Sequence, residues 1–238
     1  MKKHLPNFIT LVNLFSGTVA LYMVLEGHST WALIMLGIAF ACDFLDGFSA
    51  RLLHVVSPLG KQLDSLADLV SFGVVPAAMT FIVLKSFLLP DPDHSFAMLQ
   101  FIEKVVLFIP ALIPLFSALR LAKFNLQEDS QAFYGLPTPA YALFWTGIYM
   151  DILDDGMLLG RDVNSWLLIG LIVFTTIFMV LPLPMISLKI KNFSLRDNIY
   201  RYLLVLLAVV VLAFTGVAGL SIVIVAYILL SLVRIILT

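Results

Sequence analysis

The sequence predicts an all-α integral membrane protein with about eight transmembrane helices and with both termini in the cytoplasm. Of the 238 residues, 61% are hydrophobic and only 12% are charged, and the mean hydropathy is +1.06. The 14 basic and 15 acidic residues are too few to coat a soluble protein of this size. The apolar residues also fall in long runs, and the basic residues gather on one side of the resulting topology.

The apolar runs define the helices in order along the chain. A helix needs about 20 apolar residues to cross the hydrocarbon core of a bilayer. Runs near this length cover residues 5–25, 30–51, 62–88, 98–121, 136–152, 164–188, 199–216 and 218–237. The first run contains Pro6, Asn7 and Thr10 and lacks a clear cleavage site of small residues, so we interpret it as a retained helix. The last two runs are divided around Gly216 and Gly219.

The basic residues orient these helices, because cytoplasmic loops carry an excess of Lys and Arg. With the N-terminus inside, only Lys85, Lys104 and Arg161 of the 14 basic residues fall outside. The other 11 are Lys2, Lys3, Arg51, Lys61, Arg120, Lys123, Lys189, Lys191, Arg196, Arg201 and Arg234. This distribution favours an even number of spans in a multi-pass protein of the cytoplasmic membrane.

The chain is expected to form one membrane domain over residues 1–238, because no low-complexity tract or internal repeat divides it. Residues 189–201 are amphipathic and form either a segment lying along the lipid surface or a solvated loop. The single cysteine, Cys42, excludes an intramolecular disulfide. Its apolar neighbours indicate a small buried side chain rather than a reactive thiol.

Four acidic residues lie within or beside the second and third predicted helices. Asp43 and Asp46 are three residues apart, and Asp64 and Asp68 are four apart, so each pair shares a helix face. A short connection allows the two helices to pack antiparallel and to bring the pairs together near the cytoplasmic end. An ionised acid without a partner costs a few kcal/mol inside a membrane, so these residues indicate a functional site.

The same four acids predict a metal site. Neighbouring carboxylates repel one another unless cations bind among them. Carboxylate oxygens suit Mg²⁺ or Mn²⁺, which keep positions open for water or phosphate. Four acids can hold two such ions about 3.5–4 Å apart, the arrangement used for phosphoryl transfer. Zinc is not expected, because no set of Cys and His ligands accompanies the acids.

The residues around the acids carry a resemblance to a known family. They read Asp43-x-x-Asp46-Gly47-x-x-Ala50-Arg51 and, after eight further residues, Gly60-x-x-x-Asp64-x-x-x-Asp68. This pattern resembles the signature of the CDP-alcohol phosphotransferase family at every defined position. The small residues leave room for a base and its diphosphate, or they serve close helix packing. Arg51 either neutralises phosphate or anchors its helix at the interface.

The resemblance implies a family core at about residues 1–190, two further helices at about residues 199–237, and a homodimer. It also implies that a hydroxyl group displaces CMP from a CDP-linked lipid. Asp43, Asp46 and Asp64 would be the core metal ligands, and Asp68 would contribute to metal binding and act as general base. The implied contacts with the CDP-linked lipid are Asn13, Gly47, Ala50, Arg51 and Gly60.

Residues 6–13, PNFITLVN, resemble the first helix of the same family. Asn7, Thr10 and Asn13 recur every three residues and form a polar stripe that should face the other helices rather than lipid. Asn13 is the preferred contact with the cytidine side of the pocket. Plain hydrogen bonding between helices is the alternative.

Three segments resemble the phosphatidylserine synthase branch of the family: residues 63–76, LDSLADLVSFGVVP; 118–125, ALRLAKFN; and 134–140, YGLPTPA. The branch implies L-serine as the acceptor and CDP-diacylglycerol or an archaeal ether analogue as the donor. Arg120, Lys123, Asn125 and Thr138 are then candidates for binding serine. Lys123 stands where arginine is more usual, and both cations also fit membrane anchors.

Other functions stay open at this point. The acceptor in the same chemistry could be glycerol phosphate or inositol phosphate instead of serine. A cation transporter also places acids within a membrane, but these acids cluster toward one face and no inverted repeat of broken helices is evident. A purely structural scaffold gives no reason for four acids, and nothing in the sequence suggests a nucleic-acid partner.

Overall fold

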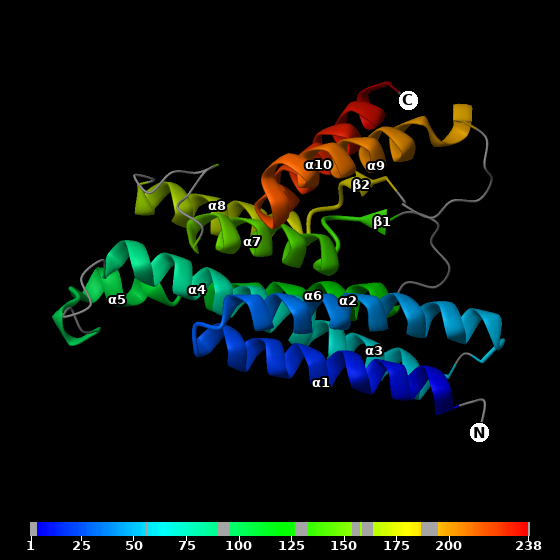
Figure 1. Cartoon of the computed structure of the whole chain (residues 1–238), viewed down its shortest axis with the longest axis horizontal. Helices are drawn as coiled ribbons and strands as arrows, with labels where there is room; N and C mark the ends of the chain where they lie inside the picture. The colour runs from blue at the N-terminus through cyan, green and yellow to red at the C-terminus, as the bar shows by residue number, and fades with distance from the viewer. Residues whose placement is uncertain are drawn as a thin grey trace.

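A computed structural model describes residues 4–55, 57–89, 96–126, 133–153, 158, 164–186 and 195–237, and these are almost entirely helical (Figure 1). The α-helices are α1 (Leu5–Leu25), α2 (Ser29–Leu52), α3 (Pro58–Leu69), α4 (Val75–Leu88), α5 (Phe101–Leu107), α6 (Leu112–Leu126), α7 (Thr138–Leu153), α8 (Ser165–Phe178), α9 (Leu195–Thr215) and α10 (Leu220–Leu237). A π turn, η2 (Val70–Val74), joins α3 to α4, and the 3-10 turns are η3 (Phe96–Met98), η4 (Ile109–Ala111) and η5 (Gly216–Gly219). Strands β1 (Phe133–Tyr134) and β2 (Pro184–Met185) form a two-stranded antiparallel pair that the sequence does not predict.

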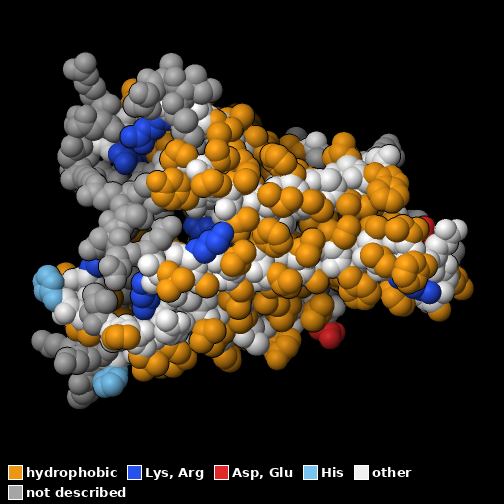
Figure 2. Space-filling model, turned by 180° about the vertical axis from the view of Figure 1, so that it is seen from behind, with side chains coloured by type: hydrophobic (Ala, Val, Ile, Leu, Met, Phe, Trp, Pro, Cys, Tyr) orange, Lys and Arg blue, Asp and Glu red, His pale blue; other side chains and the backbone are white. Residues whose placement is uncertain are grey.

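Within the described residues, five helical stretches are long and apolar enough to cross a membrane. They are Leu5–Leu25, Ser29–Leu52, Pro58–Leu88, Phe101–Leu126 and Asn198–Arg234. The last stretch is folded at η5, where Gly216 has a φ of 59°. The protein is therefore an all-α integral membrane protein, and Figure 2 shows hydrophobic side chains along the helices. Since α7 has 16 residues and α8 has 14, fewer than the roughly 20 of a typical span, the count of eight spans stays a prediction.

The third stretch is one continuous rod made of α3, η2 and α4. It begins at Pro58, before the predicted residue 62, because Ser57 caps it: the Gly60 N–H donates to Ser57 Oγ at 2.9 Å. The π turn lies just before Pro76. A proline ring clashes with the carbonyl group four residues earlier, and the wider π turn relieves that crowding.

The sixth predicted span, residues 164–188, is wrong at its end, because α8 stops at Phe178. Pro182 and Pro184 follow, and proline has no N–H to continue a helix. The chain instead packs against the segment before α7, where Gly135 has a φ of 71°. A Cβ at Gly135 would lie 2.2 Å from the Met179 carbonyl oxygen, so only glycine allows this approach.

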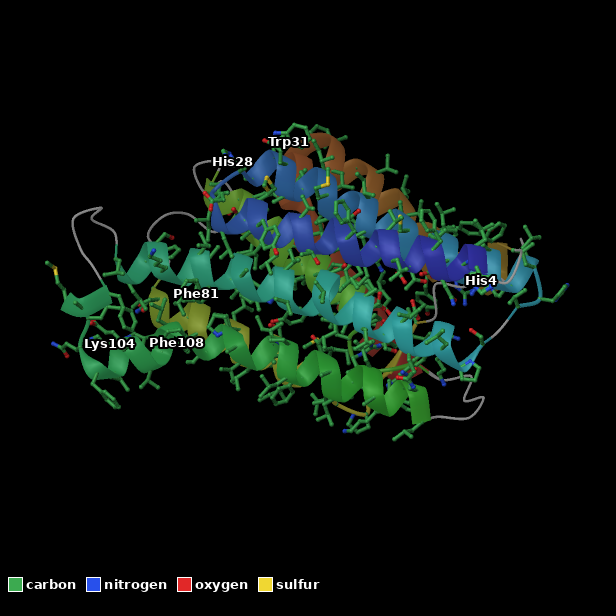
Figure 3. The ribbon with its side chains drawn as sticks, turned by 90° about the horizontal axis from the view of Figure 1, so that it is seen from below. His4, His28, Trp31, Phe81, Lys104 and Phe108 are labelled. Carbon is green, nitrogen blue, oxygen red and sulfur yellow. The ribbon has the colours of Figure 1, made fainter. Side chains whose placement is uncertain are left out.

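The helices form layers that surround a buried aromatic core. In Figure 1, α7 and α8 lie between the group of α1, α2, α3 and α4 and the hairpin of α9 and α10. Phe72 and Trp145 are fully buried, and Phe72 stacks on Phe40 with 4.4 Å between ring centroids. Helix α1 begins and α10 ends at the same end of the bundle (Figure 1), and Figure 3 shows His4 and His28 at opposite ends of α1.

The predicted amphipathic linker of residues 189–201 is only partly visible, because residues 187–194 lie outside the described residues. From Leu195 onward the linker belongs to α9. Most of the Lys and Arg side chains visible in Figure 2 lie toward the end of the bundle at which α1 begins. This agrees with the predicted grouping of basic residues, and the assignment of that end to the cytoplasm stays a prediction.

Candidate active site

Three of the four predicted acids meet between α2 and α3. Asp43 comes from α2, and Asp64 and Asp68 come from α3. One carboxylate oxygen from each of the three lies within 4.8 Å of those of the other two. Asp68 is buried, while Asp43 and Asp64 are half-buried. With a rise of about 1.5 Å per residue, Asp43 lies about 14 Å from the end of α2, well inside the bundle.

The composition of this group fits a hard divalent cation. At 4.8 Å, two ionised carboxylates repel by about 3.5 kcal/mol at an effective dielectric constant of about 20. Arg120 of α6 lies within electrostatic range of Asp68 and offsets this repulsion only in part. Since carboxylate oxygens are the ligands that Mg²⁺ and Mn²⁺ prefer, Asp43, Asp64 and Asp68 are suited to bind such an ion.

Asp46 lies outside this group, against α1. Its side chain is buried, and its Oδ2 accepts a hydrogen bond of 2.6 Å from Thr10 Oγ1. A hydroxyl bond to a carboxylate is stronger than one between neutral groups, and a buried carboxylate left without it loses that stabilisation. The structure thus places Asp46 at the border between α1 and α2, and its role as a metal ligand stays a prediction.

The predicted polar stripe of α1 faces α2 and α3, which confirms its orientation. Thr10 is buried and contacts Asp46, and Asn13 is fully buried. The Asn13 amide Nδ2 donates to Asp68 Oδ1 at 3.4 Å, and its Oδ1 accepts a hydrogen bond of 2.7 Å from Ser71 Oγ. The hydrogen bonds between helices named as the alternative for this stripe are therefore present.

The small residues of the motif differ in how much space they leave. A Cβ at Gly60 would lie 2.9 Å from Asn7 Oδ1, so a larger residue would displace the Asn7 side chain where α1 passes the start of α3. A Cβ at Gly47 would meet the Arg51 guanidinium at an ordinary 3.6 Å, which shows that Arg51 folds back over Gly47. Arg51 is exposed and Ala50 is half-buried, both near the end of α2.

Two of the four candidates for binding an acceptor have polar atoms without a partner. Arg120 of α6 is half-buried, and its Nε is buried without a hydrogen-bond partner among the described residues. It lies within range of electrostatic interaction with Asp68 and Tyr227. Thr138, at the start of α7, is fully buried, and its Oγ1 also has no partner in the described chain. Buried polar atoms are usually hydrogen-bonded, so unpartnered ones are available to a ligand.

The other two candidates, Lys123 and Asn125, lie near the end of α6. The side chain of Lys123 is exposed. Asn125 Nδ2 donates to Ser65 Oγ at 2.7 Å, and the Asn125 carbonyl accepts from Lys61 Nζ at 2.7 Å. Asn125 therefore connects α6 to α3, and its side-chain amide already donates a hydrogen bond within the protein.

Sequence reasoning passed over two residues that the structure brings to the site. Ser71 lies three residues after Asp68, a spacing that places both on one helix face and could have identified it. Tyr227 of α10 lies within electrostatic range of Arg120, and its hydroxyl donates to the Ile186 carbonyl at 3.0 Å. Nothing local marks Tyr227, because its nearness to Arg120 depends on how α10 packs.

Comparison with known proteins adds an independent line of evidence. The model of the CDP-alcohol phosphatidyltransferase family matches residues 3–181. The chain is 26% identical to a CDP-diacylglycerol–serine O-phosphatidyltransferase of Helicobacter pylori J99, over 96% of this chain and 90% of that protein. It is 31% identical to the protein of that name from Mycobacterium tuberculosis H37Rv, over 86% of this chain and 68% of that one. The Methanocaldococcus jannaschii protein of the same name is 33% identical, over 60% and 59% respectively.

Proposed function

Because the chain belongs to the CDP-alcohol phosphatidyltransferase family, we propose that it transfers a phosphatidyl group from a CDP-linked lipid to L-serine. The serine hydroxyl oxygen attacks the phosphorus on the lipid side of the diphosphate. The bond from this phosphorus to the bridging oxygen breaks, CMP leaves, and a phosphodiester to serine forms. The single observation that carries the proposal is the group of Asp43, Asp64 and Asp68.

In this proposal the four acids form the metal site. Asp43, Asp46, Asp64 and Asp68 would hold two Mg²⁺ or Mn²⁺ ions, and the carboxylate oxygens within 4.8 Å support this role for three of them. When bound, the ions supply positive charge that offsets the charge developing on the diphosphate and on CMP. Asp46 is the ligand with the least direct support, because Thr10 occupies one of its oxygens.

Asp68 is the proposed general base. It takes the proton of the serine hydroxyl as the new bond to phosphorus forms, which makes the oxygen a better nucleophile. Its burial and its bond from Asn13 support this role, since both hold the carboxylate in one place. Asp68 also contributes to metal binding.

The CDP part of the donor is proposed to lie beside α1, α2 and the start of α3. Asn13 and Arg51 contact its polar groups, with Arg51 compensating phosphate charge at the exposed end of α2. Gly47, Ala50 and Gly60 provide the space. The space beside Gly60 is narrow in this structure, because the Asn7 side chain of α1 lies there, 2.9 Å from the position of a Cβ.

Serine is proposed to lie between α3, α6 and α7. The unpartnered Nε of Arg120 supports binding of the serine carboxylate, and the unpartnered Oγ1 of Thr138 supports a further hydrogen bond. Asn125 and Lys123 complete the proposed set, with Asn125 acting through its bond to Ser65 and with Lys123 at the exposed rim.

The arrangement in the membrane is part of the same proposal. We infer a single membrane domain over residues 1–238, a homodimer, and an active site that faces the cytoplasm from the cytoplasmic membrane. The end of the bundle at which α1 begins carries most of the visible basic side chains, which supports that orientation (Figure 2).

Purified full-length protein tests the reaction. With CDP-diacylglycerol, L-serine and Mn²⁺ or Mg²⁺, we expect release of CMP together with phosphatidylserine, and EDTA should abolish both. Asp68→Asn should lower kcat by about 10²-fold or more, the usual contribution of a general base. Glu26→Gln, a change of an exposed acid at the opposite end of α1, is the matched control and should leave kcat unchanged.

The alternatives correspond to distinct outcomes. CMP release with glycerol phosphate or inositol phosphate but not with serine would reassign the acceptor. Full activity of Asp68→Asn would reject the base. Cation flux into proteoliposomes, with no CMP release in any reaction mixture, would show that the protein is a cation transporter and not an enzyme.

A further inference from the structure

The π turn η2 begins two residues after Asp68 and carries Ser71. The Val75 N–H bonds to the Val70 carbonyl, five residues back, which defines the wider turn. Turns of this kind are rare and frequently occur at functional sites. Ser71 is fully buried, although a buried hydroxyl needs a partner to offset its lost hydration.

Ser71 finds that partner on α1, which lies directly against α3 and η2 (Figure 3). Its Oγ donates to Asn13 Oδ1 at 2.7 Å and also lies 3.3 Å from the Asn13 carbonyl oxygen. Asn13 Nδ2 in turn donates to Asp68 Oδ1 at 3.4 Å. The three side chains therefore form a chain of hydrogen bonds that ends on a carboxylate of the acidic group.

This chain selects one orientation of the Asn13 carboxamide. With Oδ1 toward the Ser71 hydroxyl, Nδ2 faces Asp68, and each donor meets an acceptor. The reverse orientation would bring Oδ1 against the Asp68 carboxylate, so that two acceptors would face each other. The Asp68 carboxylate, which can only accept, therefore sets the orientation, and the Ser71 hydroxyl holds the carboxamide in place by donating to Oδ1.

The close approach of α1 to η2 depends on Gly17. A Cβ at Gly17 would lie 2.1 Å from Ser71 Oγ and 2.9 Å from Ser71 Cα. Gly17 follows Asn13 by one helical turn, so the two residues lie on the same face of α1. The missing side chain at position 17 is what lets the Ser71 hydroxyl reach Asn13.

We propose that Ser71 is a positioning residue for the transfer reaction: its hydroxyl holds the Asn13 carboxamide with Nδ2 toward Asp68. This inference rests on the proposed function, in which Asp68 is the general base. Ser71 is fully buried and acts through Asn13 rather than through a contact with substrate. Without its hydroxyl, Asn13 turns more freely, and the Asp68 carboxylate loses its fixed place beside Asp43 and Asp64.

A double-mutant cycle on the full-length protein tests the proposal. Ser71→Ala should lower kcat by about 3- to 30-fold, as expected for one buried hydrogen bond, and should leave the KM for serine unchanged within about twofold. Asn13→Ala should cost at least as much. Since Ser71 acts through Asn13, the double variant should match Asn13→Ala alone, and the two single effects should not multiply.

The control is Ser117→Ala, because Ser117 is also fully buried and packs against Gly73 of the same π turn. In the described part of the chain its Oγ makes one weak hydrogen bond, to the Met179 sulfur at 3.9 Å, so kcat should stay at the wild-type value. Thermal unfolding of each variant checks that it is folded. If Ser71→Ala does not fold, the same cycle with Ser71→Cys, a residue of similar shape and weaker donor strength, gives the answer.

The outcomes distinguish a failure of the proposed function from a failure of the positioning role of Ser71. A wild-type protein that releases no CMP rejects the proposed function. An active wild type with Ser71→Ala at full kcat, or with single effects that multiply in the double variant, rejects the positioning role alone. A Ser117→Ala variant as impaired as Ser71→Ala also rejects it, because the loss would then follow from packing around the π turn.

Discussion

Replacing Asp43 by asparagine should raise the stability of the metal-free protein while lowering its activity. Asp43 takes part in two of the three carboxylate pairs of the acidic group. Each ionised pair at 4.8 Å repels by about 3.5 kcal/mol at an effective dielectric constant of about 20. Because Asp43 and Asp64 are half-buried, solvent screens part of this repulsion, and we expect a net gain of about 2–3 kcal/mol.

The assay is thermal unfolding in detergent with EDTA and then with Mn²⁺. For a chain of this length, each kcal/mol of added stability raises the unfolding temperature by about 2–4 °C. Mn²⁺ at about 100 times its Kd should stabilise the wild type by about 2.7 kcal/mol and the Asp43→Asn variant much less. The difference in stability between Asp43→Asn and the wild type should therefore become smaller, or change sign, when Mn²⁺ is added.

Glu26→Gln removes one negative charge from an exposed position far from the acids, and it should change neither unfolding temperature nor the response to Mn²⁺. A lower stability of Asp43→Asn than of the wild type in EDTA would show that repulsion among the acids does not destabilise the metal-free protein. Equal stabilisation of both proteins by Mn²⁺ would show that Asp43 does not belong to the cation site.

Three further changes test other parts of the site. Thr10→Val removes the 2.6 Å bond to Asp46 and should lower kcat by about tenfold or more in the CMP assay, whereas a wild-type rate would show that this bond does not matter. Gly60→Ala places a Cβ 2.9 Å from Asn7 Oδ1 and should reduce both the stability of the protein and its affinity for the CDP-linked lipid. Gly37→Ala is the control and should change neither, because a Cβ there meets nothing within 4 Å. Equal effects of the two changes would show that the contact with Asn7 does not matter. Thr138→Val should raise the KM for serine by about 3- to 10-fold and leave the KM for the CDP-linked lipid unchanged. If the KM for the lipid rises instead, Thr138 does not bind serine.

Much of the architecture could be predicted because membrane helices are determined by local hydropathy. Helix α1 begins and ends at the predicted residues, and the boundary between α9 and α10 falls at the predicted glycines. Errors arose where proline chemistry interrupts an apolar run. Pro182 and Pro184 end α8 early, and the run up to residue 188 gave no hydropathy signal of that change.

The grouping of the acids could be predicted in part from their spacing. The i, i+3 and i, i+4 spacings placed each pair of acids on one helix face, and the short connection predicted that α2 and α3 bring them together. Local spacing could not tell that Asp46 turns toward Thr10 while Asp43 joins Asp64 and Asp68. That division depends on where α1 lies against α2, which is a property of the packed bundle.

The amino-acid sequence alone determined that this is a membrane protein, and it predicted a site at four acids on two neighbouring helices, because hydropathy and helical periodicity are local properties. Only the tertiary structure decided which carboxylates share one group and which residues support them. Ser71 reaches Asn13 because Gly17 lets α1 approach the π turn, and Tyr227 comes near Arg120 because α10 packs back over the bundle. Such contacts join residues that are distant along the chain, and they depend on the shapes of surfaces that exist only after the helices have packed.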